Sequence, residues 1–306
     1  MKGQQIMKQQ PKIAFLGGDG RQQTAAVKLS GGEWNIFVWG QPNTLNNNRI
    51  FYCDNIYETI ADAFAIVLPL PASTDGVLLN CRADLPEKSV SLMMIADMIS
   101  QDAIVIGGKL PKNFTDYALS KGIKCIDYFE SEAFQIKNAY TTAEAAVSIA
   151  MANLDKNIYR SKIAITGYGR IAKQLSRLLV SMGAEVTVCA RKESDLVWAE
   201  LSGAKTLLLN EKDPRSLRHL TDGYDVIYNT VPRWLFDEDF LREVDKNTLM
   251  IELASAPGGI DVSAAKRLGS KVLWAASLPG KYAPESAGQI ISDCVRSILD
   301  AERGSV

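Results

Sequence analysis

Short apolar runs alternate along the chain with longer segments whose apolar residues recur at helical spacing. In the first half of the chain, the runs predict strands at Lys12–Leu16, Trp34–Trp39, Ala65–Leu68, Ala103–Ile106 and Lys124–Asp127. The segments between them predict helices near Gln22–Leu29, Ser89–Ile99 and Asn113–Lys121. Short apolar strands separated by helices are typical of a parallel sheet that is covered on both faces.

The same alternation continues in the second half of the chain. It predicts strands at Lys162–Thr166, Glu185–Cys189, Lys205–Leu208, Val226–Asn229, Thr248–Glu252 and Lys271–Trp274. A chain of 306 residues is longer than a typical single domain. We therefore predict an α/β protein with two doubly wound, Rossmann-like parallel-sheet domains and an interdomain cleft.

The turn after the strand Lys162–Thr166 has two glycines and opens an apolar-periodic helix, Arg170–Met182. In a dinucleotide-binding turn, the first glycine makes the tight connection and the second lets the backbone approach a pyrophosphate at the helix N-terminus. The motif alone is weak, but strand, turn, helix and second strand follow here at the expected spacing. We expect a nicotinamide cofactor to contact Gly167, Tyr168, Gly169, Arg170 and Ile171.

The choice between NADP and NAD depends on the residues about 20 positions after this turn, where an acidic residue would bind the adenosine ribose. This sequence has Ala190-Arg191-Lys192 there. Arg191 and Lys192 suit a 2′-phosphate through charge-assisted hydrogen bonds, so we predict NADP. In the alternative, both are solvated and Glu193 or Asp195 binds the ribose of NAD.

Thr141-Thr142-Ala143-Glu144 has the pattern of a capping box and predicts a connecting helix from Thr141 to about Asn153. We place a degenerate Rossmann-like, substrate-binding domain at residues 1–140 and the NAD(P)-binding domain at residues 141–285. A last helix, Ser286–Ala301, is expected to return to the N-terminal domain, so that residues 286–306 join it.

Ligands of doubly wound sheets bind outside the carboxyl ends of the strands, so the residues just after each strand are informative. Asn229, Thr230 and Pro232 follow the strand Val226–Asn229, and we expect them to meet the nicotinamide side of the cofactor. Two loops, Glu252–Asp261 and Ser277–Gln289, follow the next strands and are rich in glycine and proline. One binding cleft explains these corresponding positions better than separate ordinary turns do.

Composition excludes several other classes of protein. The formal net charge is −1, which gives no global attraction to nucleic acid or to an anionic membrane. No apolar stretch is long enough for a transmembrane helix, and the polar residues Met1–Gln10 lack a signal core, so we expect a cytoplasmic protein. The five cysteines form no C-x-x-C pair, and the single histidine, His219, reads as a surface residue, so we predict no metal site.

Several motifs together resemble the A subunit of dipicolinate synthase: Gly17–Gln22, Gly167–Ala172, Asn229–Pro232, Leu253–Gly259 and Leu278–Gln289. The resemblance covers essentially the whole chain after the first ten residues. The combination of Gly17–Gln22 with Leu278–Gln289 is the distinctive part of the resemblance. The departures are Tyr168 inside the turn, Ala172 at its third small position, and Ser286 in place of an expected threonine.

The resemblance implies an NADP-dependent oxidation of dihydrodipicolinate to dipicolinate (pyridine-2,6-dicarboxylate) during sporulation. It also implies a partner, the flavodoxin-like B subunit, and a location in the mother-cell cytoplasm of a sporulating bacterium. Formation of an aromatic ring favours the reaction, so a strong general base is less necessary. Whether the chain forms a homo-oligomer is left open.

A dicarboxylate substrate needs cationic or hydroxyl donors on both sides of its ring. We nominate Arg21, Ser73 and Thr74 from the N-terminal domain. From the cofactor domain we nominate Lys281, which is also our candidate catalytic residue. In the alternative, Arg21 pairs with Asp19 at a helix start, Ser73 and Thr74 cap a turn, and Lys281 is solvated.

Two other functions fit parts of the sequence. A D-2-hydroxyacid dehydrogenase shares this two-domain plan, but it needs a histidine near the end of the cofactor domain. Ser277–Gln289 contains no histidine, and His219 lies too early in the chain. In the second alternative, the chain is a non-catalytic NADP-binding protein that regulates a flavoprotein partner, which would explain the missing acid–base pair.

Overall fold

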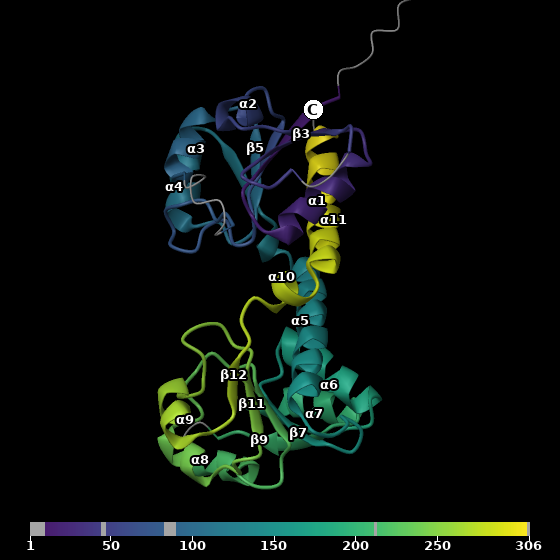
Figure 1. Cartoon of the computed structure of the whole chain (residues 1–306), viewed down its shortest axis with the longest axis vertical. Coiled ribbons are helices and arrows are strands. Elements are labelled where there is room, and N and C mark those ends of the chain that lie inside the picture. The colour runs from purple at the N-terminus through teal and green to yellow at the C-terminus, as the bar shows by residue number, and fades with distance from the viewer. Residues whose placement is uncertain (1–9, 44–46, 83–89, 211–212, 305–306) are drawn as a thin grey trace, which may run out of the picture. The chain divides into compact units, whose positions relative to one another are not determined.

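The computed structural model describes residues 10–43, 47–82, 90–210 and 213–304. They form two compact units (Figure 1). Unit 1 comprises residues up to Gln135 together with the C-terminal segment from Pro284, and unit 2 comprises Ile136–Ala283. The division falls inside helix α5 (Glu132–Asn153), and so does the boundary at residue 140 that the sequence suggested. Each unit is a parallel sheet with flanking helices, so the predicted fold class is confirmed.

Unit 1 has a six-stranded sheet in the order β3-β2-β1-β4-β5-β6, with every neighbouring pair parallel. Its strands are β1 (Lys12–Leu16), β2 (Asn35–Trp39), β3 (Ile50–Tyr52), β4 (Ala65–Val67), β5 (Ile104–Gly107) and β6 (Lys124–Asp127). Its helices are α1 (Gly20–Ser30), α2 (Ile56–Ile60), α3 (Leu92–Met98), α4 (Lys112–Ser120), the 3-10 helix η2 (Tyr128–Glu130) and α11 (Pro284–Arg303).

Helices cover both faces of this sheet. Successive strand residues point to opposite sides, so the side chains on both sides are buried. Ile13 and Phe15 lie in one apolar cluster with α1 and α11. Ala14 and Leu16 lie in another, with α2, α3 and α4. This explains why the strands read as continuous apolar runs in the sequence.

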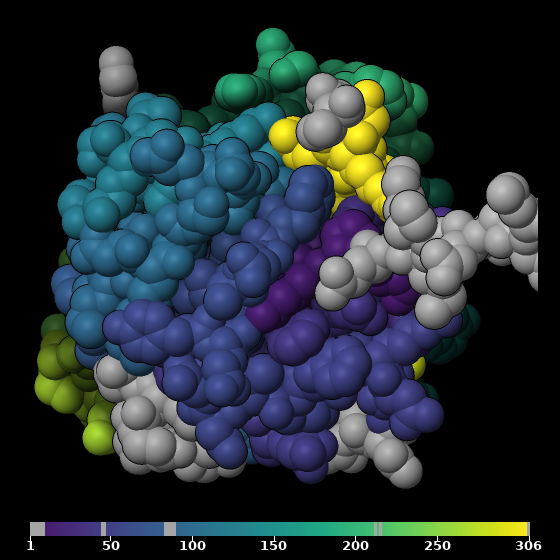
Figure 2. All heavy atoms as spheres, turned by 90° about the horizontal axis from the view of Figure 1, so that it is seen from above, coloured from purple at the N-terminus to yellow at the C-terminus, as the bar shows by residue number. Residues whose placement is uncertain are grey.

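Helix α11 completes unit 1 although it is the last helix of the chain. It packs along α1, and Figure 2 shows C-terminal residues in yellow against N-terminal ones in purple. Ile291, Val295 and Leu299 bury their side chains there, and each such burial contributes about 1.5–3 kcal/mol. The two helices approach closely at Gly288, where a Cβ atom would come within 2.6 Å of the Arg21 carbonyl oxygen.

Unit 2 repeats the plan, with the order β12-β11-β10-β7-β8-β9 and parallel pairing throughout. Its strands are β7 (Lys162–Thr166), β8 (Glu185–Ala190), β9 (Lys205–Leu208), β10 (Val226–Asn229), β11 (Leu249–Glu252) and β12 (Val272–Trp274). Besides the greater part of α5, its helices are α6 (Arg170–Ser181), α7 (Glu193–Leu201), α8 (Glu238–Glu243), α9 (Val262–Leu268), α10 (Leu278–Tyr282) and the 3-10 helix η3 (Pro214–Leu220).

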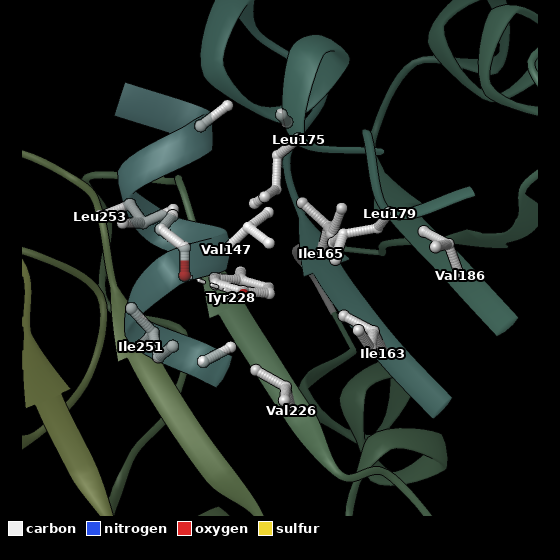
Figure 3. Close-up of a cluster of buried hydrophobic side chains, with 14 of the residues drawn as sticks. Val147, Ile163, Ile165, Leu175, Leu179, Val186, Val226, Tyr228, Ile251 and Leu253 are labelled. Carbon is white, nitrogen blue, oxygen red and sulfur yellow. Dashed lines mark hydrogen bonds between the residues drawn. The ribbon is translucent and has the colours of Figure 1, made fainter. Parts of the chain in front are cut away.

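The buried side chain of Tyr228 connects two elements in the core of unit 2. Ile163, Ile165 and Val226 of the central strands pack with Val147 of α5 (Figure 3). Within this cluster the Tyr228 hydroxyl donates a hydrogen bond of 3.1 Å to the Ala146 carbonyl oxygen. Burial raises the pKa of Tyr228 above its ordinary value, so this hydroxyl stays a proton donor. The bond ties strand β10 to helix α5.

The prediction that a helix begins at Thr141 is wrong, because α5 begins at Glu132. The Thr141 and Thr142 hydroxyls donate to the carbonyls of Lys137 and Asn138, at 3.4 and 2.9 Å, which lie one turn earlier. Such bonds place a threonine inside a helix. The capping-box pattern was therefore present without a helix end.

One strand of unit 1 was not predicted. β3 pairs with β2 at the edge of the sheet, and its three residues are too few to show a periodic pattern. The predicted helix Ser89–Ile99 corresponds to α3, whose N-cap is Ser91; residue 89 lies outside the described residues. Residues 1–9, on which the expected cytoplasmic location partly depends, lie outside them as well. Within the described part of the chain, no helix is long and apolar enough to cross a membrane.

Candidate functional site

The turn that joins β7 to α6 needs its first glycine for two reasons. Gly167 has a φ of +89°, a conformation that side chains disfavour. A Cβ atom there would also come within 2.6 Å of the Thr230 side-chain oxygen. The turn is therefore held tightly against the residues that follow β10.

The second glycine of the turn faces open space. Gly169 has an ordinary φ of −78°, and no atom lies within 4 Å of the position a Cβ atom would take. It is the N-cap residue of α6 and has no side chain to accept from the first N–H groups of that helix. A helix N-terminus of this kind is suited to an anion such as a pyrophosphate.

A pocket of about 630 Å³ lies in front of this turn, at the carboxyl ends of β7, β8 and β9 and beside the segment after β10. This volume is in the usual range for a small-molecule site. Most of the residues predicted to bind the cofactor line it: Gly167, Tyr168, Gly169, Arg191, Lys192, Thr230 and Pro232. The structure therefore brings together residues that are more than 60 positions apart in the sequence.

Three of the predicted cofactor residues do not line this pocket. Arg170 and Ile171 begin α6, where Arg170 is exposed and Ile171 packs against the apolar core. Asn229 is fully buried at the end of β10. The Asn229 side chain forms hydrogen bonds with Thr166, Glu252 and the Val231 N–H.

The pocket carries charges of both signs. Arg191 and Lys192 follow β8 and are exposed, and Asp195 lines the same pocket from the first turn of α7. Guanidinium and ammonium groups suit a phosphate, whereas a carboxylate would accept from a ribose hydroxyl. Both of the chemistries considered for the adenosine ribose are thus present in one pocket.

Other lining residues were not predicted from the sequence. They follow β9 or lie in the segment after β10: Leu209, Asn210, Asp213, Ser216, Leu217, Val231, Trp234, Leu235 and Asp237. The position of Leu209 and Asn210 directly after a predicted strand was the available signal. The contribution of Trp234 depends on the path of the chain after β10, which the sequence pattern does not reveal.

A buried carboxylate fixes the loops beside the pocket. Glu252, at the end of β11, is fully buried and accepts hydrogen bonds from the Asn229 amide at 2.8 and 2.9 Å. It also accepts from the backbone N–H groups of Ala254, Gly259 and Ile260, at 2.8–3.1 Å. A buried carboxylate is tolerated when its oxygens are satisfied in this way.

Asn229 extends this network to the central strand. Its amide oxygen accepts from the Thr166 hydroxyl at 2.6 Å and from the Val231 N–H at 3.1 Å. Gly259 lies so close to the Asn229 side chain that a Cβ atom there would come within 2.5 Å of the amide nitrogen. A larger residue would therefore displace this network. The network therefore joins the carboxyl ends of β7, β10 and β11, and it positions the segment that begins at Thr230.

Unit 1 has a similar glycine turn after β1, but its own chain covers that turn. The Gly18 N–H donates to the Asn80 carbonyl at 2.8 Å. A Cβ atom at Gly17 would come within 2.8 Å of the same oxygen and 2.9 Å of the Cys81 sulfur. The two glycines after β1 are therefore in contact with the protein's own chain, whereas Gly169 of unit 2 is not. That unit 1 is a degenerate, substrate-binding domain stays a prediction.

The three predicted substrate residues of unit 1 follow the ends of β1 and β4. Arg21 is only 8% exposed; its guanidinium forms a salt bridge with Asp19 at 2.8 Å and donates to the Leu70 carbonyl. The Ser73 hydroxyl donates to Asp75 at 2.9 Å and accepts from the Gly76 N–H, while Thr74 is exposed. Arg21 and Ser73 thus have the intramolecular partners considered in the alternative interpretation.

Lys281 belongs to unit 2, on the short helix α10 that follows β12, and it is exposed. Ser277, the N-cap residue of that helix, has a positive φ of +58°. The structure thus places Lys281 in one unit and the other predicted substrate residues in the other. Its candidate catalytic role stays a prediction.

His219 and the five cysteines do not line the pocket beside Gly169. His219 is exposed on η3. Burial raises the pKa of the Cys189 thiol to about 12 and that of Cys125 to about 11, which keeps both protonated. Among the described residues, no cluster of three or more His, Cys, Asp or Glu could hold a metal ion.

The chain is similar to known proteins along nearly its whole length. Residues 12–129 match the model of the N-terminal domain of the dipicolinate synthase A subunit. The chain is 28% identical over 298 residues to the A subunit of dipicolinate synthase of Bacillus subtilis (strain 168), covering 96% of this chain and 98% of the relative. Its structure resembles the crystal structure of dipicolinate synthase A chain from Bacillus subtilis, with a TM-score of 0.83, 26% identity, and 97% and 98% of the two chains covered.

A second crystal structure gives the same result. The A subunit of dipicolinate synthase from Bacillus halodurans matches with a TM-score of 0.81 and 25% identity, covering 96% of this chain and 99% of that one. The resemblance predicted from the sequence motifs is confirmed along nearly the whole chain.

Proposed function

This chain is a relative of the dipicolinate synthase A subunit over almost its entire length, and on that premise we propose that it is an NADP-dependent oxidoreductase. We propose that it oxidises dihydrodipicolinate to dipicolinate. The observation that carries the proposal is the pocket in front of the Gly167–Gly169 turn. It combines an open helix N-terminus with two cations at the end of β8.

The residues of this pocket fit a dinucleotide. Gly169 leaves room for a pyrophosphate at the start of α6, and Thr230 and Pro232 line the pocket beside it. Arg191 and Lys192 would bind a 2′-phosphate through charge-assisted hydrogen bonds, which favours NADP. If Asp195 bound the ribose hydroxyls instead, the preference would be for NAD.

When bound, the nicotinamide ring would accept a hydride from dihydrodipicolinate, which also loses one proton and becomes the aromatic pyridine-2,6-dicarboxylate. The protein must then bind two carboxylates and receive one proton. We propose Arg21, Ser73, Thr74 and Lys281 for the carboxylates. Lys281, exposed on α10 of unit 2, is the candidate catalytic residue.

We further infer a biological setting from the relatives. Similarity to the A subunit of dipicolinate synthase implies a second subunit, which we propose to be flavodoxin-like. We place the reaction in the mother-cell cytoplasm during sporulation.

The test is anaerobic turnover by the purified chain alone, with freshly generated dihydrodipicolinate and either NADP⁺ or NAD⁺. Reduced cofactor and dipicolinate would be followed together by absorbance. We expect both to appear in equal amounts, and faster with NADP⁺. Dipicolinate that forms without cofactor reduction, or only after the partner protein is added, would show a cofactor-binding component in place of a dehydrogenase. Oxidation of lactate or glycerate would instead identify a hydroxyacid dehydrogenase.

A further inference from the structure

Trp234 is an exposed aromatic side chain in the wall of the pocket. It follows β10 by five positions, and the residue is 61% exposed although it lines a cavity. An exposed indole costs free energy that burial against a ligand would recover. Among the described lining residues, the other aromatic one is Tyr168, which is buried in the core of unit 2.

The position of the pocket indicates which half of a dinucleotide Trp234 would meet. The lining comes from the ends of β7, β8 and β9 and from the segment after β10; among the described residues, none of it comes from the ends of β11 or β12. A doubly wound sheet consists of two mononucleotide-binding halves that meet at the point where the strand order reverses. β7, β8 and β9 form the first half here. In such a fold the residue that binds the adenosine ribose follows the second strand, so this half would hold the adenosine.

The apolar part of the lining suits a flat base. Leu209 and Leu217 line the pocket with Trp234 and are themselves buried, so they are fixed in place. Arg191 and Lys192 lie in the same pocket at the end of β8, where the 2′-phosphate of NADP is expected. One pocket therefore offers an aromatic face for a base and cations for a phosphate on its ribose.

We propose that Trp234 binds the adenine of the cofactor by stacking its indole on the base. The proposal rests on the dinucleotide site proposed above, and it assigns the adenosine half of NADP to the described pocket. Base–aromatic stacking is sequence-tolerant and contributes substantially to affinity. It follows that 2′,5′-ADP, which lacks the nicotinamide, binds to the same pocket and depends on the same tryptophan.

The experiment is calorimetric titration of the full chain with NADP⁺, with 2′,5′-ADP and with nicotinamide mononucleotide. The variants are Trp234→Ala, Trp234→Phe and, as matched control, Trp198→Ala. Trp198 is 63% exposed on α7 of the same unit and does not line the pocket. We expect Trp234→Ala to weaken NADP⁺ and 2′,5′-ADP about tenfold, Trp234→Phe much less, and Trp198→Ala not at all. Any binding of nicotinamide mononucleotide is unchanged in all three variants.

Different failures are distinguishable. If the wild-type chain binds NADP⁺ but Trp234→Ala binds it equally well, the stacking proposal is wrong and the dinucleotide site stands. A loss confined to nicotinamide mononucleotide would place the indole at the other end of the cofactor and would also overturn the proposal. If the wild-type chain binds neither NADP⁺ nor 2′,5′-ADP, the proposed function fails with it. If the alanine variant does not fold, the change in tryptophan fluorescence on binding 2′,5′-ADP replaces it: the proposal requires this change in the wild-type chain and its loss in Trp234→Phe, and an equal change in both would overturn it.

Discussion

At the scale of single residues, the two glycines of the turn after β7 are needed for different physical reasons. Gly167 supplies a positive φ and fits beneath Thr230, so its role lies in the folded structure. Gly169 has an ordinary φ and nothing in front of it, so its role lies in what binds there. Substitutions should therefore separate the two roles.

We predict that Gly169→Val leaves the fold intact and weakens NADP⁺ binding at least tenfold, which is about 1.4 kcal/mol, because the side chain occupies the path of the pyrophosphate. Gly167→Ala should instead destabilise the chain by about 1–2 kcal/mol through its positive φ. Denaturant unfolding and cofactor titration measure the two effects. Unchanged cofactor affinity in folded Gly169→Val would remove the pyrophosphate site.

Arg191 is predicted to set the cofactor preference. Arg191→Ala should weaken NADP⁺ binding by about 1.5–3 kcal/mol, the usual range for a hydrogen bond to a charged group, and change NAD⁺ binding little. Dissociation constants for both cofactors measure this preference. Arg177→Ala is the control, because Arg177 is an exposed arginine of α6 that does not line the pocket. Equal losses for the two cofactors would show that Arg191 does not bind the 2′-phosphate.

At the scale of elements, the sequence predicted strands better than the contacts between them. Apolar runs such as Lys162–Thr166 mark strands because both faces of the sheet are buried. The short strand β3 and the start of α5 were missed because three residues show no period and because a capping pattern can occur inside a helix. Leu209 and Trp234 were not predicted as pocket residues. The lining of a pocket depends on which strands are neighbours in the sheet, and the sequence pattern does not give that order.

The network around Glu252 belongs to this scale, because it joins the ends of three strands. We predict that Glu252→Gln lowers the free energy of unfolding by about 1–3 kcal/mol, since the new amide group would face backbone donors and leave at least one unsatisfied. Glu238→Gln is the control: that carboxylate accepts from Arg242 and Arg267 on the surface, where ion pairs contribute little.

Denaturant unfolding of both variants compares the two sites. Cofactor titration of Glu252→Gln adds a second measurement, because Asn229 positions the segment that begins at Thr230. Equal stability of the two variants would show that the buried carboxylate can be replaced by an amide without loss.

The contact between α1 and α11 gives a further prediction. Alanine usually stabilises a helix interior by about 0.5–1 kcal/mol relative to glycine. We expect the opposite for Gly288→Ala, a loss of about 1–3 kcal/mol, because the methyl group would overlap Thr24 and the Arg21 carbonyl. Gly31→Ala is the control, since its nearest neighbour lies at 3.7 Å. Hydrogen exchange would locate the loss in unit 1, and a gain in stability would show that the two helices move apart freely.

At the scale of the whole molecule, the two units are built on one plan but use their glycine turns differently. Both have the strand order of a doubly wound sheet, and both have glycines after the first strand. In unit 1 the segment around Asn80 covers the turn, whereas in unit 2 the turn opens on the pocket. The sequence predicted the shared plan, but it could not show the covering segment, which comes from a distant part of the chain.

The return of α11 to unit 1 has a consequence for how the protein is made. Ribosomes release a chain from its N-terminus, so domains usually fold in the order of the sequence. Here the residues of unit 1 emerge first, but Ile291, Val295 and Leu299 of its core emerge only after all of unit 2. We expect a nascent chain stalled before Pro284 has left the ribosome to resist protease in unit 2 and to be cleaved in unit 1. The unit that begins the chain is then the last to be completed, and until release the apolar face of α1 is open to chaperones.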